Sequence, residues 1–98
     1  MELKDFERED CKFSIPARPT VRQQMEYFSA TAGAVGSQML YRYWAGALTL
    51  IQSWNCEGMP NQKVNLDEIS NPDQTAVIVW AALQVKSYMD TLENVSKN

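Results

Sequence analysis

The residue types that most often carry out enzymatic chemistry are scarce in this sequence of 98 residues. Histidine, the commonest general base and zinc ligand, does not occur. Cys11 and Cys56 form no CxxC motif and so indicate no zinc site. Because no secretory signal is recognisable, we predict that both cysteines are free thiols. The stretch "GAVGS", residues 33–37, lacks the lysine that a phosphate-binding loop requires.

Carboxylates are the remaining candidates for chemistry. Four of them lie within residues 5–10, but they lack the glycine turn and the ligand spacing of a calcium loop, and we interpret them as a solvated charged segment. Asp67 and Glu68 could pair for acid–base catalysis, yet beside a helix start they more simply complement the helix dipole. The sequence therefore predicts no catalytic residue, no cofactor and no metal ligand, and a protein that is not an enzyme.

Charge and hydropathy narrow the classes of partner. Nine Lys and Arg residues against twelve Asp and Glu residues give a formal charge of −3, whereas phosphate binding needs a clustered basic excess. Nucleic acid is therefore not expected as a partner. The longest apolar run, "TAVIVWAAL", is far shorter than the roughly 20 residues that cross a bilayer. The polar opening "MELKDFERED" does not have the pattern of a signal peptide, so we expect a cytoplasmic protein with no membrane association.

Any functional group in this chain must be positioned by helices. Apolar residues recur at steps of three and four along most of the sequence, which predicts a single domain over residues 1–98 with an all-α fold, a small helical bundle. The first helix begins after Thr20, which with Gln23 has the pattern of a capping box. The second has an apolar face that runs from Leu40 to Trp54.

The sequence also predicts where the third helix begins and what the two chain ends are like. In "NPDQ", Asn71 is a helix cap and Pro72 takes the first helical position. Residues 1–12 read as a polar, flexible segment and residues 93–98 as a frayed tail. One short alternating pattern, residues 11–15, suggests a strand, and it could pair with residues 63–66 in a minor two-stranded β-ribbon.

The segment "SATAGAVGS", residues 29–37, raises the question of whether one helix continues through it. The apolar stripe that starts at Val21 and Met25 reaches Met39 without losing helical phase. This favours a thinned helical segment bent at Gly33 or Gly36 over a loop. An internal packing seam or a turn between two helices remains the principal interpretation of the two glycines, and a docking groove for a helical client is the alternative.

Three stretches of the chain carry a family resemblance: "FSIPARPTVRQQMEYFSA", "YRYWAGALTLIQSWNCEGMPN" and "NPDQTAVIVWAALQVKSYMDTLENVSKN". Together they resemble small tail assembly chaperones of tailed, siphovirus-type bacteriophages and prophages. The resemblance covers most of the chain from Phe13 onward and contains no catalytic signature. It implies a mainly helical protein that binds the long helical tape-measure protein, helps to recruit tail-tube subunits in the cytoplasm of the bacterial host, and is not part of the mature virion.

Small and flexible apolar residues mark the predicted partner-binding surface: Met25, Ala32, Gly33, Gly36 and Met39. A helical client could dock closely against the small residues, and a homo-oligomer is an open alternative. Two other functions remain open: a structural or adaptor protein that stays in the phage particle, and a small acidic phage inhibitor of a host protein.

Overall fold

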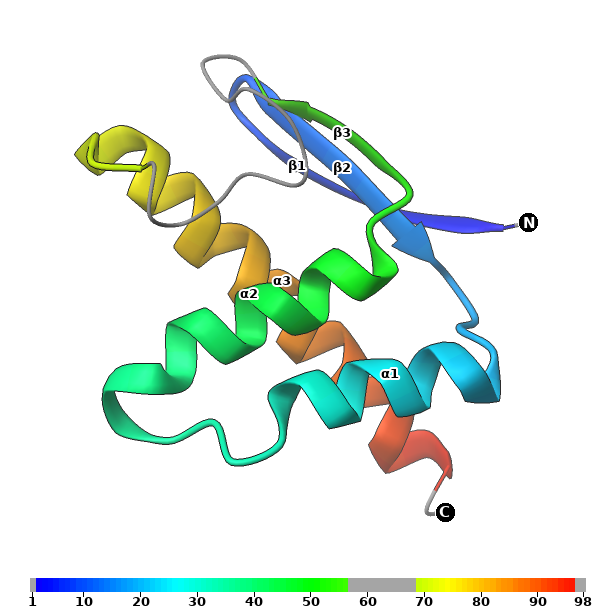
Figure 1. The fold of residues 1–98 in the computed structure, drawn as a ribbon. Coiled ribbons are helices and arrows are strands. Elements are labelled where there is room, and N and C mark those ends of the chain that lie inside the picture. The colour runs from blue at the N-terminus through cyan, green and yellow to red at the C-terminus, as the bar shows by residue number, and fades with distance from the viewer. Residues whose placement is uncertain (1, 57–68, 97–98) are drawn as a thin grey trace.

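The computed structural model describes residues 2–56 and 69–96, in which three α-helices lie on one side of a three-stranded antiparallel sheet (Figure 1). In chain order the elements are β1 (Leu3–Arg8), β2 (Cys11–Pro16), α1 (Val21–Thr31), the 3₁₀ turn η1 (Gly36–Gln38), α2 (Met39–Leu50), β3 (Ser53–Cys56) and α3 (Pro72–Ser96). The prediction of an all-α bundle is therefore wrong. The fold is α+β, with 59% helix and 21% strand.

Strand β2 is the centre of the sheet, between β1 and β3. The alternating residues Cys11, Phe13 and Ile15 are buried, which confirms the strand expected from their spacing. Phe13 lies between its cross-strand partners Phe6 and Trp54, and the three rings form a row across the sheet. The predicted ribbon is wrong in its pairing, because both edges of β2 are taken by β1 and β3; residues 63–66 lie outside the described residues.

The polar N-terminal segment supplies strand β1, which the sequence pattern did not predict. Of its side chains only Phe6 is buried, so the segment has no apolar periodicity to reveal it. Arg8 pairs with Cys11, and the intervening Glu9 and Asp10 make a two-residue hairpin turn. Glu9 has φ = 42°, the left-handed backbone that such turns require.

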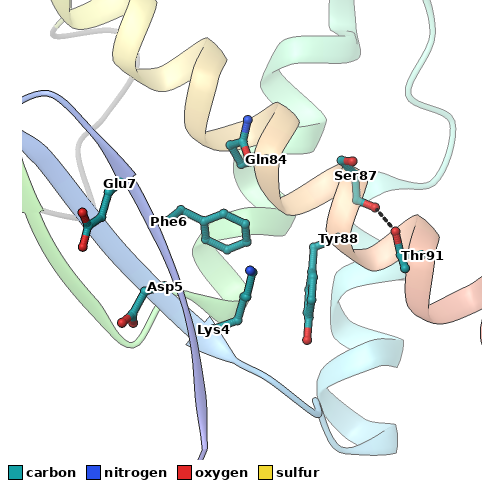
Figure 2. A pocket seen from close by; sticks show the side chains of 8 residues that line it. All are labelled: Lys4, Asp5, Phe6, Glu7, Gln84, Ser87, Tyr88 and Thr91. Carbon is teal, nitrogen blue, oxygen red and sulfur yellow. Dashed lines mark hydrogen bonds between the residues drawn. The ribbon is translucent and has the colours of Figure 1, made fainter.

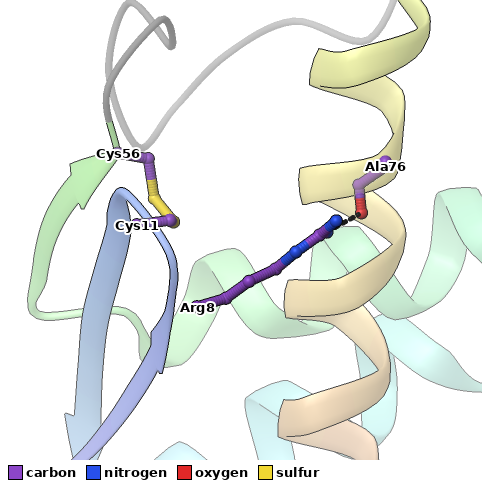
Figure 3. The surroundings of a disulfide bond; sticks show 4 residues. All are labelled: Arg8, Cys11, Cys56 and Ala76. Atoms are coloured by element: carbon purple, nitrogen blue, oxygen red, sulfur yellow. Dashed lines mark hydrogen bonds between the residues drawn. A yellow bond between two sulfur atoms is a disulfide. The ribbon is translucent and has the colours of Figure 1, made fainter.

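Cys11 and Cys56 face each other across β2 and β3, where the structure joins them in a disulfide (Figure 3). The prediction of free thiols is therefore wrong for this fold. That prediction was based on the absence of a secretory signal and not on the fold, in which the pairing of β2 with β3 brings the two Cα atoms to 3.9 Å. On the same end of the sheet, Arg8 reaches across to α3 and donates from Nη1 to the Ala76 carbonyl at 3.3 Å (Figure 3).

Helix α3 begins as predicted, with the Asn71 Oδ1 accepting the Asp73 N–H at 2.8 Å. Its buried side contributes Ile78, Ala81, Ala82, Val85 and Met89 to the core. The Trp80 ring stands edge-on to Phe13 of the sheet at a centroid distance of 5.4 Å. Within the part of the chain that the structure describes, none of the helices has the length and apolar character needed to cross a membrane.

The segment 29–37 does not continue the helix. Helix α1 ends at Thr31, Ala32 is extended, and Gly33 and Gly36 have φ values of 74° and 55°. Two left-handed residues so close together reverse the chain, so α1 and α2 form a helical hairpin (Figure 1). The prediction of a thinned, bent helix is wrong, and its alternative, a turn between two helices, is what the structure contains.

The close approach of two helices occurs instead at Gly46 in the middle of α2. A Cβ placed on Gly46 would lie 2.6 Å from Thr31 Cγ2 and 3.0 Å from Tyr27 Cδ2, both on α1. Carbon atoms in good contact are about 3.5–4.0 Å apart, so only glycine fits this position. The packing seam of the helical hairpin is therefore at Gly46.

Helix α2 also ends earlier than the pattern indicates. Ile51 adopts ψ = 123°, which leaves the helix, and the Gln52 N–H donates to the Ser14 carbonyl of β2 at 2.9 Å. Trp54 then packs beside Phe13 as part of β3. Extension of the second helix to Trp54 is thus wrong, because pairing with β2 overrides local helical periodicity.

Candidate partner-binding surface

Helix α1 is firmly anchored at its N-terminal end. The Gln23 N–H donates to Thr20 Oγ1 at 3.2 Å, and the Thr20 N–H donates to Gln23 Oε1 at 2.8 Å. This pair confirms the predicted capping box. Gln24 adds a bond from Nε2 to the Pro19 carbonyl at 3.0 Å. Three hydrogen bonds therefore fix the start of α1 to the residues that precede it.

One side of α1 packs against α2 through Tyr27, which is 2% exposed. Burial raises the pKa of the Tyr27 phenol well above its usual range, and the nearby Asp90 carboxylate adds to the effect. No group among the described residues hydrogen-bonds the Tyr27 hydroxyl. Tyr27 therefore holds α1 in place chiefly by packing.

The opposite side of α1 is apolar and exposed. Val21, Met25 and Phe28 are 72%, 66% and 40% exposed, and we call these three residues the α1 stripe. Their spacing of four and three residues places them on one face of the helix. The Phe28 ring also packs edge-on against Tyr27 at a centroid distance of 5.5 Å, whereas most of the surface of Val21 and Met25 is open to solvent. Apolar side chains gathered in this way commonly mark an interaction site.

A shallow groove of about 780 Å³ lies beside the α1 stripe and continues toward α2. Its lining consists of Val21, Arg22, Met25, Glu26, Ser29, Ala30 and Thr49. Arg22 and Glu26 form an exposed ion pair with Nε and Oε1 3.4 Å apart, so charge borders the apolar floor. Apolar contact surrounded by polar groups is the usual composition of a protein-binding site.

The five residues predicted to bind a partner fall on three different elements. Met25 lies in the α1 stripe, Ala32 and Gly33 follow the end of α1, and Gly36 and Met39 lie at the start of η1 and α2. All five are exposed. Only Met25 lines the groove, so the structure does not bring the five together in one groove.

The sequence did not single out Val21 and Phe28 as surface residues, although their spacing was visible. A stripe of this kind can face either the core or a partner, and the sequence contains no signal that decides between them. In the structure, the exposed ion pair of Arg22 and Glu26 lies beside Val21 and Met25, which places this side of the helix at the surface.

The described residues include no group of three or more His, Cys, Asp and Glu side chains that could hold a metal ion. The exposed surface of α1 can offer apolar contact and two charges, which suits binding of another protein. The chain matches no known protein family, no curated protein and no solved structure.

Proposed function

We propose that this protein is a bacteriophage tail assembly chaperone that binds the helical tape-measure protein through the α1 stripe. The carrying observation is the exposed face made by Val21, Met25 and Phe28 on a helix whose other side is fixed by Tyr27. Apolar residues at positions i, i+4 and i+7 are the pattern by which one helix recognises another. The sequence resemblance to tail assembly chaperones supplies the identity of the client.

A chaperone role fits this surface better than a permanent structural role. The α1 stripe is short and its groove is shallow and open, which favours a weak and reversible contact. The flexible side chain of Met25 can adapt to several apolar partners along a long repetitive client. Such a contact holds the client in solution until tail-tube subunits replace it, and the chaperone is then released.

Co-expression with a tape-measure protein of a siphovirus-type phage tests the proposal. We expect the intact chain to raise the soluble yield of the client and Met25→Lys to abolish the gain, because the ammonium group enters an apolar contact. The matched control is Leu83→Lys, which also replaces an exposed apolar residue, but on α3. Equal activity of both variants would contradict the α1 stripe as the docking surface.

A second measurement separates this role from a structural one. Mass spectrometry of purified virions should find the protein far below the stoichiometry of tail components. If it persists at stoichiometric levels, it is a component of the particle and the chaperone proposal is wrong. The substitutions at Met25 and Leu83 affect exposed positions, so each should change the free energy of unfolding by no more than about 0.5 kcal/mol.

A further inference from the structure

A second groove lies on another part of the molecule, along the free edge of β1 (Figure 2). Residues 4–7 of β1 form one wall, and Gln84, Ser87, Tyr88 and Thr91 of α3 form the other. The groove has a volume of about 390 Å³. Among the described residues no strand pairs with this edge, since the sheet order is β1-β2-β3.

The register of the hairpin shows which backbone groups point into solvent at this edge. The Ala17 N–H donates to the Glu2 carbonyl at 2.9 Å, so Glu2 and Ala17 are a hydrogen-bonded pair of the ladder. Hydrogen-bonded and non-bonded pairs alternate along an antiparallel ladder. The backbone N–H and C=O groups of Leu3, Asp5 and Glu7 therefore point away from β2, toward a position that a fourth strand could occupy.

The two faces of β1 carry different kinds of side chain. Lys4 and Phe6 point toward α3, where the Lys4 ammonium lies 5.6 Å from the Phe6 ring centroid and 6.0 Å from that of Tyr88 (Figure 2). Asp5 and Glu7 lie on the opposite face of the strand (Figure 2). Among the described residues, their ion-pair partner is Lys12, whose Nζ lies 3.8 Å from Asp5 Oδ2 and 3.5 Å from Glu7 Oε1. The single Lys12 ammonium thus pairs with the carboxylates of both Asp5 and Glu7, which leaves an excess negative charge on this face of the strand.

From this geometry we infer that the free edge of β1 binds an extended peptide segment with lysine or arginine at alternate positions, as a fourth strand of the sheet. Strand addition uses the outward N–H and C=O groups of Leu3, Asp5 and Glu7 for backbone bonds. The basic side chains then lie beside Asp5 and Glu7 on the outer face. The intervening side chains face Gln84, Ser87 and Thr91 of α3, so small polar residues fit there.

The same charges disfavour a second copy of this chain as the occupant. Antiparallel pairing of two β1 strands through their outward groups can only place residues 3, 5 and 7 opposite one another. Registers centred on Asp5, on Phe6 or on Glu7 put carboxylates directly opposite carboxylates, which is destabilising. Charged edge strands commonly prevent such self-association. A basic segment instead places its charged side chains directly opposite Asp5 and Glu7.

Titration of the ¹⁵N-labelled chain with the synthetic peptide acetyl-TKTKTKT-amide tests the inference by NMR. We expect shifts confined to amides of β1 and of the groove-facing side of α3, with a dissociation constant on the order of 1 mM or below. The acidic peptide acetyl-TETETET-amide should produce no shifts. Absence of shifts with the basic peptide at several millimolar, or shifts centred on α1, would overturn the inference.

Backbone N-methylation of the peptide separates strand addition from simple charge attraction. In antiparallel pairing, the lysines beside Asp5 and Glu7 are the residues that exchange backbone bonds with β1, so their N–H groups are essential. N-methylation at the lysines should abolish binding, and N-methylation at the threonines should leave it unchanged. If both peptides bind equally, the contact is not a β-ladder.

Charge reversal on the protein provides the matching control. The double variant Asp5→Lys with Glu7→Lys should weaken peptide binding about tenfold, because two cross-strand attractions become repulsions. The triple variant Gln38→Lys, Ser70→Lys and Asp73→Lys changes the net charge equally at exposed positions on other surfaces and should leave binding unchanged. Equal weakening by both variants would show that net charge alone attracts the peptide. This site shares no residue with the α1 stripe, so the result is independent of the chaperone proposal.

Discussion

The substitution Gly46→Ala tests how closely α1 and α2 are packed. The methyl group it adds would lie 2.6 Å from Thr31 Cγ2 and 3.0 Å from the Tyr27 ring. Thr31 cannot rotate away freely, because its hydroxyl donates to the Tyr27 carbonyl at 3.1 Å. Alanine at this position therefore has to push the C-terminal turn of α1 outward.

Two opposing effects determine how much Gly46→Ala changes the free energy of unfolding. In a helix interior alanine is favoured over glycine by about 1 kcal/mol. Inserting a methyl group into a filled site costs about 1–3 kcal/mol, and a contact almost 1 Å too short lies in the upper part of that range. We expect Gly46→Ala to lower the free energy of unfolding by about 1 kcal/mol, which corresponds to a fall in Tm of about 4–8 °C for a chain of this size.

A double-mutant cycle with Thr31→Ser isolates the contact. Serine keeps the hydroxyl bond and removes Cγ2, the atom nearest to the new methyl group. In the Thr31→Ser background, Gly46→Ala should be neutral or stabilising, which gives a coupling energy of about 1 kcal/mol or more. Urea and thermal unfolding followed by circular dichroism measure both backgrounds. If Gly46→Ala raises the Tm equally in both, the helices are not in close contact at Gly46 and the packing argument is wrong.

Three further predictions concern the hairpin, the disulfide and Tyr27. Reducing the disulfide of Cys11 and Cys56, which closes a loop with a sequence separation of 45, should lower the free energy of unfolding by about 4 kcal/mol; an unchanged urea midpoint would contradict this. Glu9→Gly should raise the free energy of unfolding by about 1 kcal/mol, since glycine adopts φ = 42° without strain. A fall in Tm would count against this turn geometry. The raised pKa of Tyr27 means that the unfolded chain loses the phenol proton first, so this contribution to stability is complete below about pH 10 and falls as the pH rises further. Tyr27→Phe should therefore reduce the alkaline loss, measured by urea unfolding between pH 8 and pH 11; identical pH profiles would refute it.

Local signals predicted the starts of α1 and α3 correctly. The bonds between Thr20 and Gln23, and from Asn71 to the next turn, connect residues two or three positions apart, so the sequence alone contains the whole interaction. The alternation over residues 11–15 was equally reliable, because a central strand buries every second side chain on the core face.

The strands at the edges could not be found in this way. β1 buries only Phe6, and its remaining side chains are free to be polar because they face solvent or the hairpin partner. The sequence did not predict β3 for a different reason. Trp54 continues the three- and four-residue spacing of the apolar residues of α2, although the backbone has already left the helix at Ile51. Both segments become strands because they pair with β2. For β3 this partner lies far away in the sequence, so local patterns do not reveal the pairing.

The helical phase from Val21 to Met39 was misleading because a turn between two helices changes the direction in which their faces point. Once Gly33 and Gly36 reverse the chain, residues on either side of them no longer share a face, whatever their spacing. The reversal packs the Tyr27 side of α1 against Gly46, and no other described element contacts α1 to a comparable extent. The exposure of the α1 stripe is thus a direct consequence of the turn, because a helix with apolar residues on both sides that folds back on a single neighbour buries only one of those sides.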